Sequence, residues 1–147
     1  KEFIDFYAKN IDKNSKPLNG TIKFLNWAKD KNISMAVCTN KQERLAVDLL
    51  KKLNMYEYFE YVAGSDTFAF NKPDPRHLTD VVEIIGGNLK KTIMIGDSEV
   101  DAMSAHNANI PFILVKDGYT EKSEKEIKHD ELISDFVGFE KIIEKYL

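Results

Sequence analysis

The sequence predicts an α/β fold in which a parallel sheet lies between two layers of helices, a Rossmann-like arrangement. Short apolar runs alternate with longer amphipathic segments along the chain after residue 20. Strand and helix in alternation at this spacing indicate parallel strands joined by helical connections. Ligands of such sheets bind beyond the carboxyl ends of the strands. We therefore expect functional residues in the loops that follow the apolar runs.

Composition excludes several classes of protein. The 147 residues suit one domain, and a hydrophobic content of 43% argues against a disordered or collagen-like chain. The net charge of −3 argues against nucleic-acid binding, which needs a basic face. No apolar run approaches the roughly 18–20 residues of a membrane span, and the charged start KEFIDFYAKN does not resemble a signal peptide. Cys38 is the single cysteine and cannot form an internal disulfide, so we expect a cytoplasmic protein.

The first sixteen residues differ from the rest of the chain. Large apolar residues recur at helical spacing in residues 1–13, which predicts an amphipathic helix; they are Phe3, Phe6, Tyr7 and Ile11. The segment SKPLNG, residues 15–20, gathers turn-forming residues and is typical of a linker. We therefore divide the chain into residues 1–16, a helix end with a hinge, and residues 17–147, an α/β core.

The predicted core alternates helices and strands. Helices are predicted from apolar residues at helical spacing, and one of them opens on an acidic residue with proline and closes on glycine. Strands are predicted from short apolar runs of the kind that is buried on both faces. The predicted helices span 21–32, 41–53, 74–86, 99–108 and 138–147, and the predicted strands span 33–38, 61–64, 92–95, 111–115 and 131–134.

A hydroxyl and a carboxamide follow the first predicted strand of the core. In VCTN, residues 37–40, Thr39 and Asn40 end the apolar run and precede a helix. Residues of these types most often cap helix N-termini, which is the simplest explanation of this pair. The same geometry directs a hydroxyl and backbone N–H groups at a bound phosphate, so the two roles are compatible.

A lysine and two aspartates follow the next strands. Lys72 stands before a proline in NKPDPRHL, residues 71–78, and taken alone it is most simply a solvated lysine in a surface turn. Asp97 follows the apolar run at 92–95 and a glycine, and Asp101 comes one helical turn later. A solitary acidic residue there would cap the helix. Two carboxylates suit Mg²⁺ better, because this cation takes oxygen ligands and shares them with water and substrate phosphate.

In this order, the motifs resemble those of the haloacid dehalogenase superfamily of phosphohydrolases, and of its phosphoglycolate-phosphatase-like branch in particular. The branch runs through a Pro-Gly linker, VVTNK, KPxPxxL, GDSxxD and a Gly-Tyr loop, which stand here as KPLNG, VCTNK, KPDPRHL, GDSEVD and DGY. The resemblance implies Mg²⁺-dependent hydrolysis of a small phosphorylated metabolite through a phosphoaspartyl intermediate. It implies that Thr39 and Lys72 act in catalysis, that Thr39, Asn40 and Lys72 contact the substrate, and that Asp97 and Asp101 form the metal site.

The sequence departs from that family at its first motif. No Asp-x-Asp pair occurs, and residues 1–16 resemble the end of the family's helical cap with its hinge. We therefore expect an incomplete core without its first strand, the C-terminal part of a phosphatase that is inactive without a nucleophile. The absent strand would lie between 33–38 and 92–95, where an empty gap would leave backbone groups unpaired. We expect a missing N-terminal segment to fill this place; the alternatives are a strand from a partner chain or direct pairing of the two strands.

Other functions fit the pattern less well or stay open. A receiver domain places its residues in the order Asp, Thr, Lys, whereas here the order is Thr39, Lys72, Asp97. A dehalogenase of the same superfamily does not use the Gly-Asp metal motif. A non-catalytic remnant or binding module remains the alternative, because the absence of Asp-x-Asp supports it directly. The substrate is not specified, because in this family the cap selects it.

Overall fold

A six-stranded parallel sheet forms the centre of the protein in the computed structural model, which describes residues 3–5, 17–116 and 125–147. The strand order is β3-β2-β1-β4-β5-β6, and every neighbouring pair is parallel. The strands are β1 (Phe3–Asp5), β2 (Ser34–Cys38), β3 (Tyr61–Ala63), β4 (Thr92–Gly96), β5 (Phe112–Val115) and β6 (Glu131–Ile133). The predicted Rossmann-like α/β fold is confirmed.

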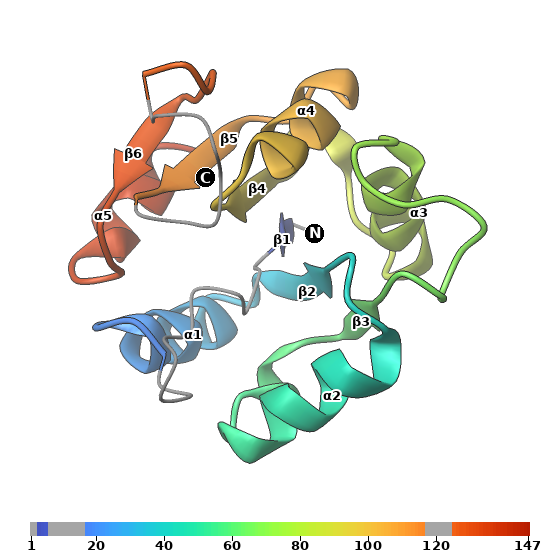
Figure 1. The fold of residues 1–147 in the computed structure, drawn as a ribbon. Coiled ribbons are helices and arrows are strands. Elements are labelled where there is room, and N and C mark those ends of the chain that lie inside the picture. Colours follow the sequence, from blue (N-terminus) through green and yellow to red (C-terminus); the bar gives the residue numbers. More distant parts are fainter. Residues whose placement is uncertain (1–2, 6–16, 117–124) are drawn as a thin grey trace.

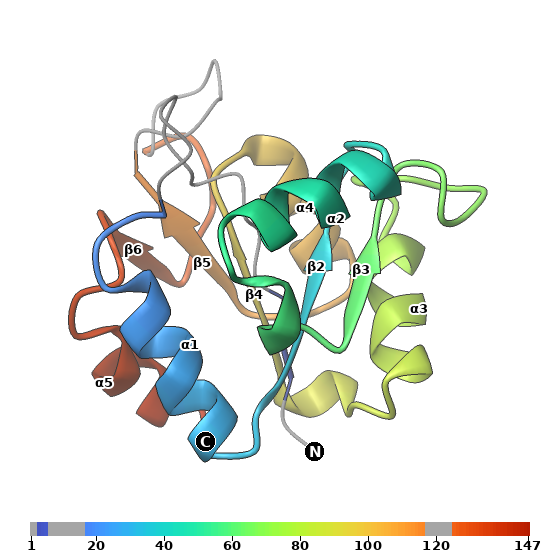
Figure 2. The same ribbon diagram turned by 90° about the horizontal axis from the view of Figure 1, so that it is seen from below.

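Helices cover both faces of this sheet. Figures 1 and 2 show α1, α2 and α5 on one side and α3 and α4 on the other. The helices are α1 (Thr21–Asp30), α2 (Glu43–Lys52), α3 (Arg76–Ile84), α4 (Glu99–Asn107) and α5 (Phe139–Glu144), with short 3₁₀ helices η1 (Tyr56–Tyr58) and η2 (Leu89–Lys91). No helix in the described ranges has the length and apolar character of a membrane span.

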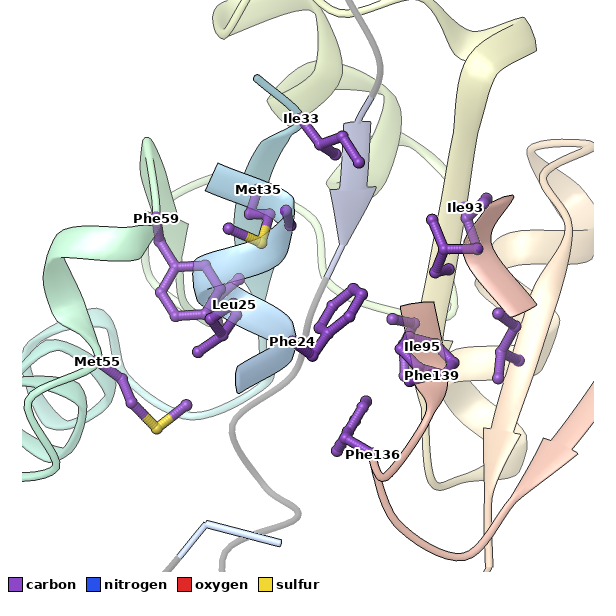
Figure 3. Packing of buried hydrophobic residues seen from close by; sticks show 14 of the residues in the cluster. Phe24, Leu25, Ile33, Met35, Met55, Phe59, Ile93, Ile95, Phe136 and Phe139 are labelled. Atoms are coloured by element: carbon purple, nitrogen blue, oxygen red, sulfur yellow. The ribbon is translucent and has the colours of Figure 1, made fainter. Parts of the chain in front are cut away.

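The core has two parts, one on each face of the sheet. Successive residues of the inner strands alternate between them: Ile93 and Ile95 face α1, α2 and α5, whereas Met94 faces α3 and α4. This two-sided burial explains why the strands are continuous apolar runs and not alternating ones. On the first face Phe24 packs edge-on against Phe139, with ring centroids 4.7 Å apart (Figure 3). Each such buried side chain contributes about 1.5–3 kcal/mol.

The prediction of a helix over residues 1–13 is wrong for the part of this segment that the structure describes. Phe3–Asp5 form β1 in the centre of the sheet, between β2 and β4. Both neighbours are buried along their whole length, so any gap between them would leave backbone N–H and C=O groups without partners. Pairing with an extended segment satisfies those groups, and this long-range gain outweighs the local helical pattern. Residues 6–16, the rest of the predicted helix end and hinge, lie outside the described residues.

The chain itself therefore supplies the strand that was expected to be absent. The three predicted possibilities were a missing segment, a strand from a partner and direct pairing of β2 with β4. None of them describes the structure, in which β1 pairs with both neighbours through three residues on each side. The gap is not empty, as argued, and in this structure β1 occupies it. That a further N-terminal segment or a partner strand takes this place stays a prediction.

Candidate active site

Four of the predicted site residues gather at the carboxyl ends of the central strands. Thr39 follows β2, Asp97 follows β4, Asp101 lies in the first turn of α4, and Lys72 lies in the loop between β3 and α3. All four are buried: the exposed fraction is 0% for Thr39, 1% for Asp97, 2% for Asp101 and 6% for Lys72. This edge is where ligands of doubly wound sheets bind. Since Lys72 is buried, the simpler reading of it as a solvated surface lysine is wrong.

Lys72 is held by a buried ion pair. Its ammonium donates to the Asp101 Oδ1 atom at 2.5 Å and to the backbone carbonyl of Cys38 at 2.8 Å. The three residues come from the β3–α3 loop, α4 and the end of β2, so the lysine joins three separate segments. A buried pair of this kind is costly to break from one side, because an uncompensated charge remains in the interior.

Asp101 is fixed on its other side by the start of α4. Its Oδ2 atom accepts a hydrogen bond from the Asp97 N–H at 3.1 Å, and its own N–H donates to Ser98 Oγ at 3.2 Å. Burial favours the neutral form of Asp101, but the Lys72 charge and the hydrogen bonds from Lys72 and Asp97 outweigh it, so the pKa of this carboxyl lies below its ordinary value. Asp101 is therefore ionised at neutral pH.

Gly96 makes room for this arrangement. A Cβ atom at this position would lie 2.6 Å from both the Cβ and the Oδ2 of Asp101. The Asp101 carboxylate thus lies directly against the backbone at the end of β4. The glycine before Asp97 is explained by this close approach, which the sequence pattern alone does not reveal.

The residue types of Thr39 and Asn40 had indicated a helix cap. In the structure neither residue caps the following helix. Helix α2 begins at Glu43, and its first N–H donates to Asp66 Oδ1 at 2.8 Å. The Thr39 hydroxyl instead accepts from the Lys41 N–H at 3.1 Å, which closes a tight turn after β2. Both predicted capping residues are thereby left at the strand end, near Lys72.

Asn40 contacts the lysine loop through both groups of its side-chain amide. Its Oδ1 accepts from the Lys72 N–H at 3.2 Å, and its Nδ2 donates to the Lys72 carbonyl at 3.1 Å. The sequence indicated a helix cap for Asn40, and the family resemblance implied a contact with substrate; neither indicated this pairing. No local pattern could reveal this pairing, because the two residues are 32 positions apart.

His77 lies buried beside the site without belonging to it. Its Nε2 donates to the Gly64 carbonyl at 3.1 Å, and its Nδ1 has no hydrogen-bond partner among the described residues. Burial lowers the pKa of His77 and the nearby Lys72 charge lowers it further, although the Gly64 hydrogen bond acts in the opposite direction. The imidazole is therefore neutral at pH 7.

The donor set suits a single hard cation held through one carboxylate. Within residues 3–5, 17–116 and 125–147 no group of three or more His, Cys, Asp or Glu side chains is arranged to hold a metal ion. Mg²⁺ does not require such a group, since it usually keeps several waters and takes one or two carboxylates with substrate phosphate. Both oxygens of Asp101 already accept hydrogen bonds from Lys72 and Asp97. The carboxylate suited to direct ligation is therefore that of Asp97, with Asp101 in a supporting position.

The register of β1 places Asp5 before the carboxyl ends of the neighbouring strands. Asp5 is paired with Ala36 on β2 and Met94 on β4, each of which lies two residues before the end of its strand. Thr39 and Asp97 come three residues after Ala36 and Met94, so at a rise of about 3.3 Å per residue the backbone of Asp5 is about 10 Å short of their level. Its register position does not match that of a nucleophile facing the site.

Comparisons with known proteins place the chain in one family. The family model for haloacid dehalogenase-like hydrolases matches residues 1–115. A phosphoglycolate phosphatase from Agrobacterium fabrum is 41% identical over 99% of this chain and 64% of its own length. The chain thus spans less than two thirds of this relative.

Solved structures share the fold. The crystal structure of a predicted phosphoglycolate phosphatase from Haemophilus somnus matches with a TM-score of 0.80 at 24% identity, over 85% of this chain and 56% of that one. A β-phosphoglucomutase from Clostridium difficile matches with a TM-score of 0.73 at 23% identity, over 88% of this chain and 56% of that one. Because these two proteins are named for different reactions, the likeness shows the fold alone.

Proposed function

Because the chain belongs to the haloacid dehalogenase-like hydrolases, we propose that it forms the phosphate- and Mg²⁺-binding core of a cytoplasmic phosphatase. The observation that carries this proposal is the buried Lys72–Asp101 pair beside Thr39 and Asp97 at the carboxyl edge of the sheet. The substrate class is a small phosphate monoester. Phosphoglycolate is the candidate, since the relative from Agrobacterium fabrum is named for it.

Each described side chain has a role in binding a phosphoryl group. Lys72 supplies a positive charge where negative charge gathers on the phosphoryl oxygens, and Asp101 keeps that ammonium charged and oriented. The Thr39 hydroxyl donates to a phosphoryl oxygen from the end of β2. Such groups act by position and charge, which is the main requirement of phosphoryl transfer.

Asp97 would hold Mg²⁺ and Asp101 would support that site, since the two are joined by the hydrogen bond from the Asp97 N–H. When bound, the metal would neutralise charge on the phosphoryl oxygens and orient the substrate. The chain's own contribution is to fix the backbone of Asp97, between β4 and α4, through the bond from its N–H to Asp101 Oδ2.

Hydrolysis through a phosphoaspartyl intermediate needs a carboxylate nucleophile at the same edge. The sequence contains no Asp-x-Asp pair, and Asp5 lies below the edge in the register of β1. We infer that the 147-residue chain binds phosphate but does not turn over phosphate monoesters. Turnover would need a further N-terminal segment, or a strand from a partner, that brings such a carboxylate to the centre of the sheet.

A second candidate function is that of a binding module. It is favoured by the absence of Asp-x-Asp together with the register of β1, which places Asp5 before the ends of the neighbouring strands. The two candidates share the anion-binding residues. They differ in whether addition of a strand that carries Asp-x-Asp produces catalysis.

The test measures binding and turnover on the same protein. Calorimetry with inorganic phosphate and Mg²⁺ should show binding to the wild-type chain, and the Lys72→Met variant should bind about 10- to 100-fold more weakly, the effect of losing one charged hydrogen bond. The matched control is Lys23→Met, since Lys23 is exposed on α1. Hydrolysis of p-nitrophenyl phosphate should be absent. Turnover that disappears in Asp97→Ala would show that the chain already contains a nucleophile, and absence of phosphate binding would refute the proposed site.

A further inference from the structure

Lys72 lies in a loop that has little regular structure to hold it. The segment between β3 and α3 runs from Gly64 to Pro75, and Pro73 directly follows the lysine and has no N–H to donate. A lysine side chain is long and has several rotatable bonds, so its ammonium is positioned only if both ends of the side chain are held. Asp101 and the Cys38 carbonyl hold the ammonium end.

Asn40 holds the backbone end. Its amide accepts from the Lys72 N–H and donates to the Lys72 carbonyl, so both backbone polar groups of one residue are paired with one side chain. Both bonds are within the usual distance range for N–H···O contacts. Asn40 stands directly after Thr39 at the end of β2. It therefore attaches the loop that carries Lys72 to the strand end that carries the Thr39 hydroxyl.

We propose that Asn40 is a positioning residue, which fixes the backbone of Lys72 so that its ammonium lies at the phosphate site. The effect of Asn40 on phosphate binding rests on the proposed function. The pairing of Asn40 with the Lys72 backbone is independent of that function. The competing role is a direct contact between the Asn40 amide and the substrate phosphate. The two roles make different demands, because a positioning role acts on the Lys72 backbone in the absence of any ligand.

The experiment follows the Lys72 amide by hydrogen exchange, measured by NMR on the ligand-free chain. Asn40→Ala removes the acceptor of the Lys72 N–H, so this amide should exchange about fivefold to tenfold faster, the effect of losing one hydrogen bond. Asn40→Asp retains the oxygen that accepts from the Lys72 N–H but sets a second oxygen against the Lys72 carbonyl in place of Nδ2, so its exchange rate should lie between those of wild type and Asn40→Ala. Urea unfolding of each variant separates this local effect from a change in global stability.

The matched control is Asn71→Ala. Asn71 is exposed, directly precedes Lys72, and takes part in the loop through its backbone carbonyl, which accepts from the Asp74 N–H. This substitution removes an amide of the same type from the same loop and leaves the Lys72 pairing in place. Exchange at Lys72 should stay at the wild-type rate.

Calorimetric titration with inorganic phosphate and Mg²⁺ supplies the second measurement. Asn40→Ala should weaken phosphate binding by about threefold to tenfold, and Asn71→Ala should leave it unchanged. Unchanged Lys72 exchange in Asn40→Ala would overturn the proposal, and so would an equal acceleration in Asn71→Ala. If wild type binds no phosphate, the proposed function fails, while the exchange result still decides whether Asn40 positions Lys72.

Discussion

Replacing Lys72 with methionine should destabilise the fold in a pH-dependent manner. The substitution preserves the length of the apolar stem but removes the charge, the bond to Asp101 Oδ1 and the bond to the Cys38 carbonyl. Asp101 then remains as a buried carboxylate that accepts a hydrogen bond from the Asp97 N–H, just before α4. Breaking a buried pair from one side costs about 3–5 kcal/mol, a large share of a total stability of about 5–15 kcal/mol.

The direction of the pH dependence follows from Asp101. In wild type its pKa is lowered, so the stabilisation is complete above the ordinary value of 3.8 and is lost as the pH falls below it. Without Lys72, burial raises the pKa of Asp101 above that value, and the variant regains stability wherever the carboxyl can be protonated. The difference between wild type and Lys72→Met should therefore be largest at pH 7 and smaller toward pH 4–5.

Urea unfolding at both pH values measures this difference. The double variant Lys72→Met/Asp101→Asn should recover part of the loss at pH 7, because no buried charge remains. Lys23→Met, at an exposed position on α1, should change the stability by less than about 0.5 kcal/mol. A loss of under about 1 kcal/mol, or one that does not vary with pH, would show that the pair does not stabilise the fold as argued.

Three further changes test other parts of the structure. Gly96→Ala places a Cβ 2.6 Å from Asp101, so thermal unfolding should show a loss of about 1–3 kcal/mol, and an unchanged midpoint would contradict the close approach. His77 has a lowered pKa, so its contribution to stability is complete above about pH 6.5 and declines as the pH falls; His77→Gln should flatten the urea stability profile below pH 6.5, and a retained slope would assign it to another group. Ile4→Pro removes a backbone donor in the middle of β1 and should cost about 3 kcal/mol or more in urea, whereas no loss would mean that residues 3–5 do not hold the centre of the sheet.

Local patterns predicted most of the elements in the core. Apolar periodicity placed the helices and strands after residue 20 to within a few residues, because each buries one stripe or both faces against its neighbours. Fold class also predicted the edge of the sheet at which Thr39, Lys72, Asp97 and Asp101 meet, since the loops after parallel strands share that edge.

Long-range pairing could not be predicted in the same way. Phe3–Asp5 carry a helical pattern, yet their conformation is decided by β2 and β4, which come about thirty and ninety residues later. The bond from the Glu43 N–H to Asp66 replaces the local cap that Thr39 and Asn40 had indicated. In each case the partner lies far along the chain, and residue type alone indicates a capacity for hydrogen bonding without indicating the partner.

The short length of β1 has a consequence for how the sheet opens. Inner strands are ordinarily the last part of a domain to exchange their amides, because opening them requires unfolding of the whole core. Here the innermost strand has only three residues, whereas its neighbour β4 has five, β5 has four, and both of these are packed under α4. We expect the order to be inverted, with amides of β1 exchanging before those of β5. The seam along β1 would then be the place where the sheet admits another extended chain, by strand exchange at its centre and not by addition at its edges.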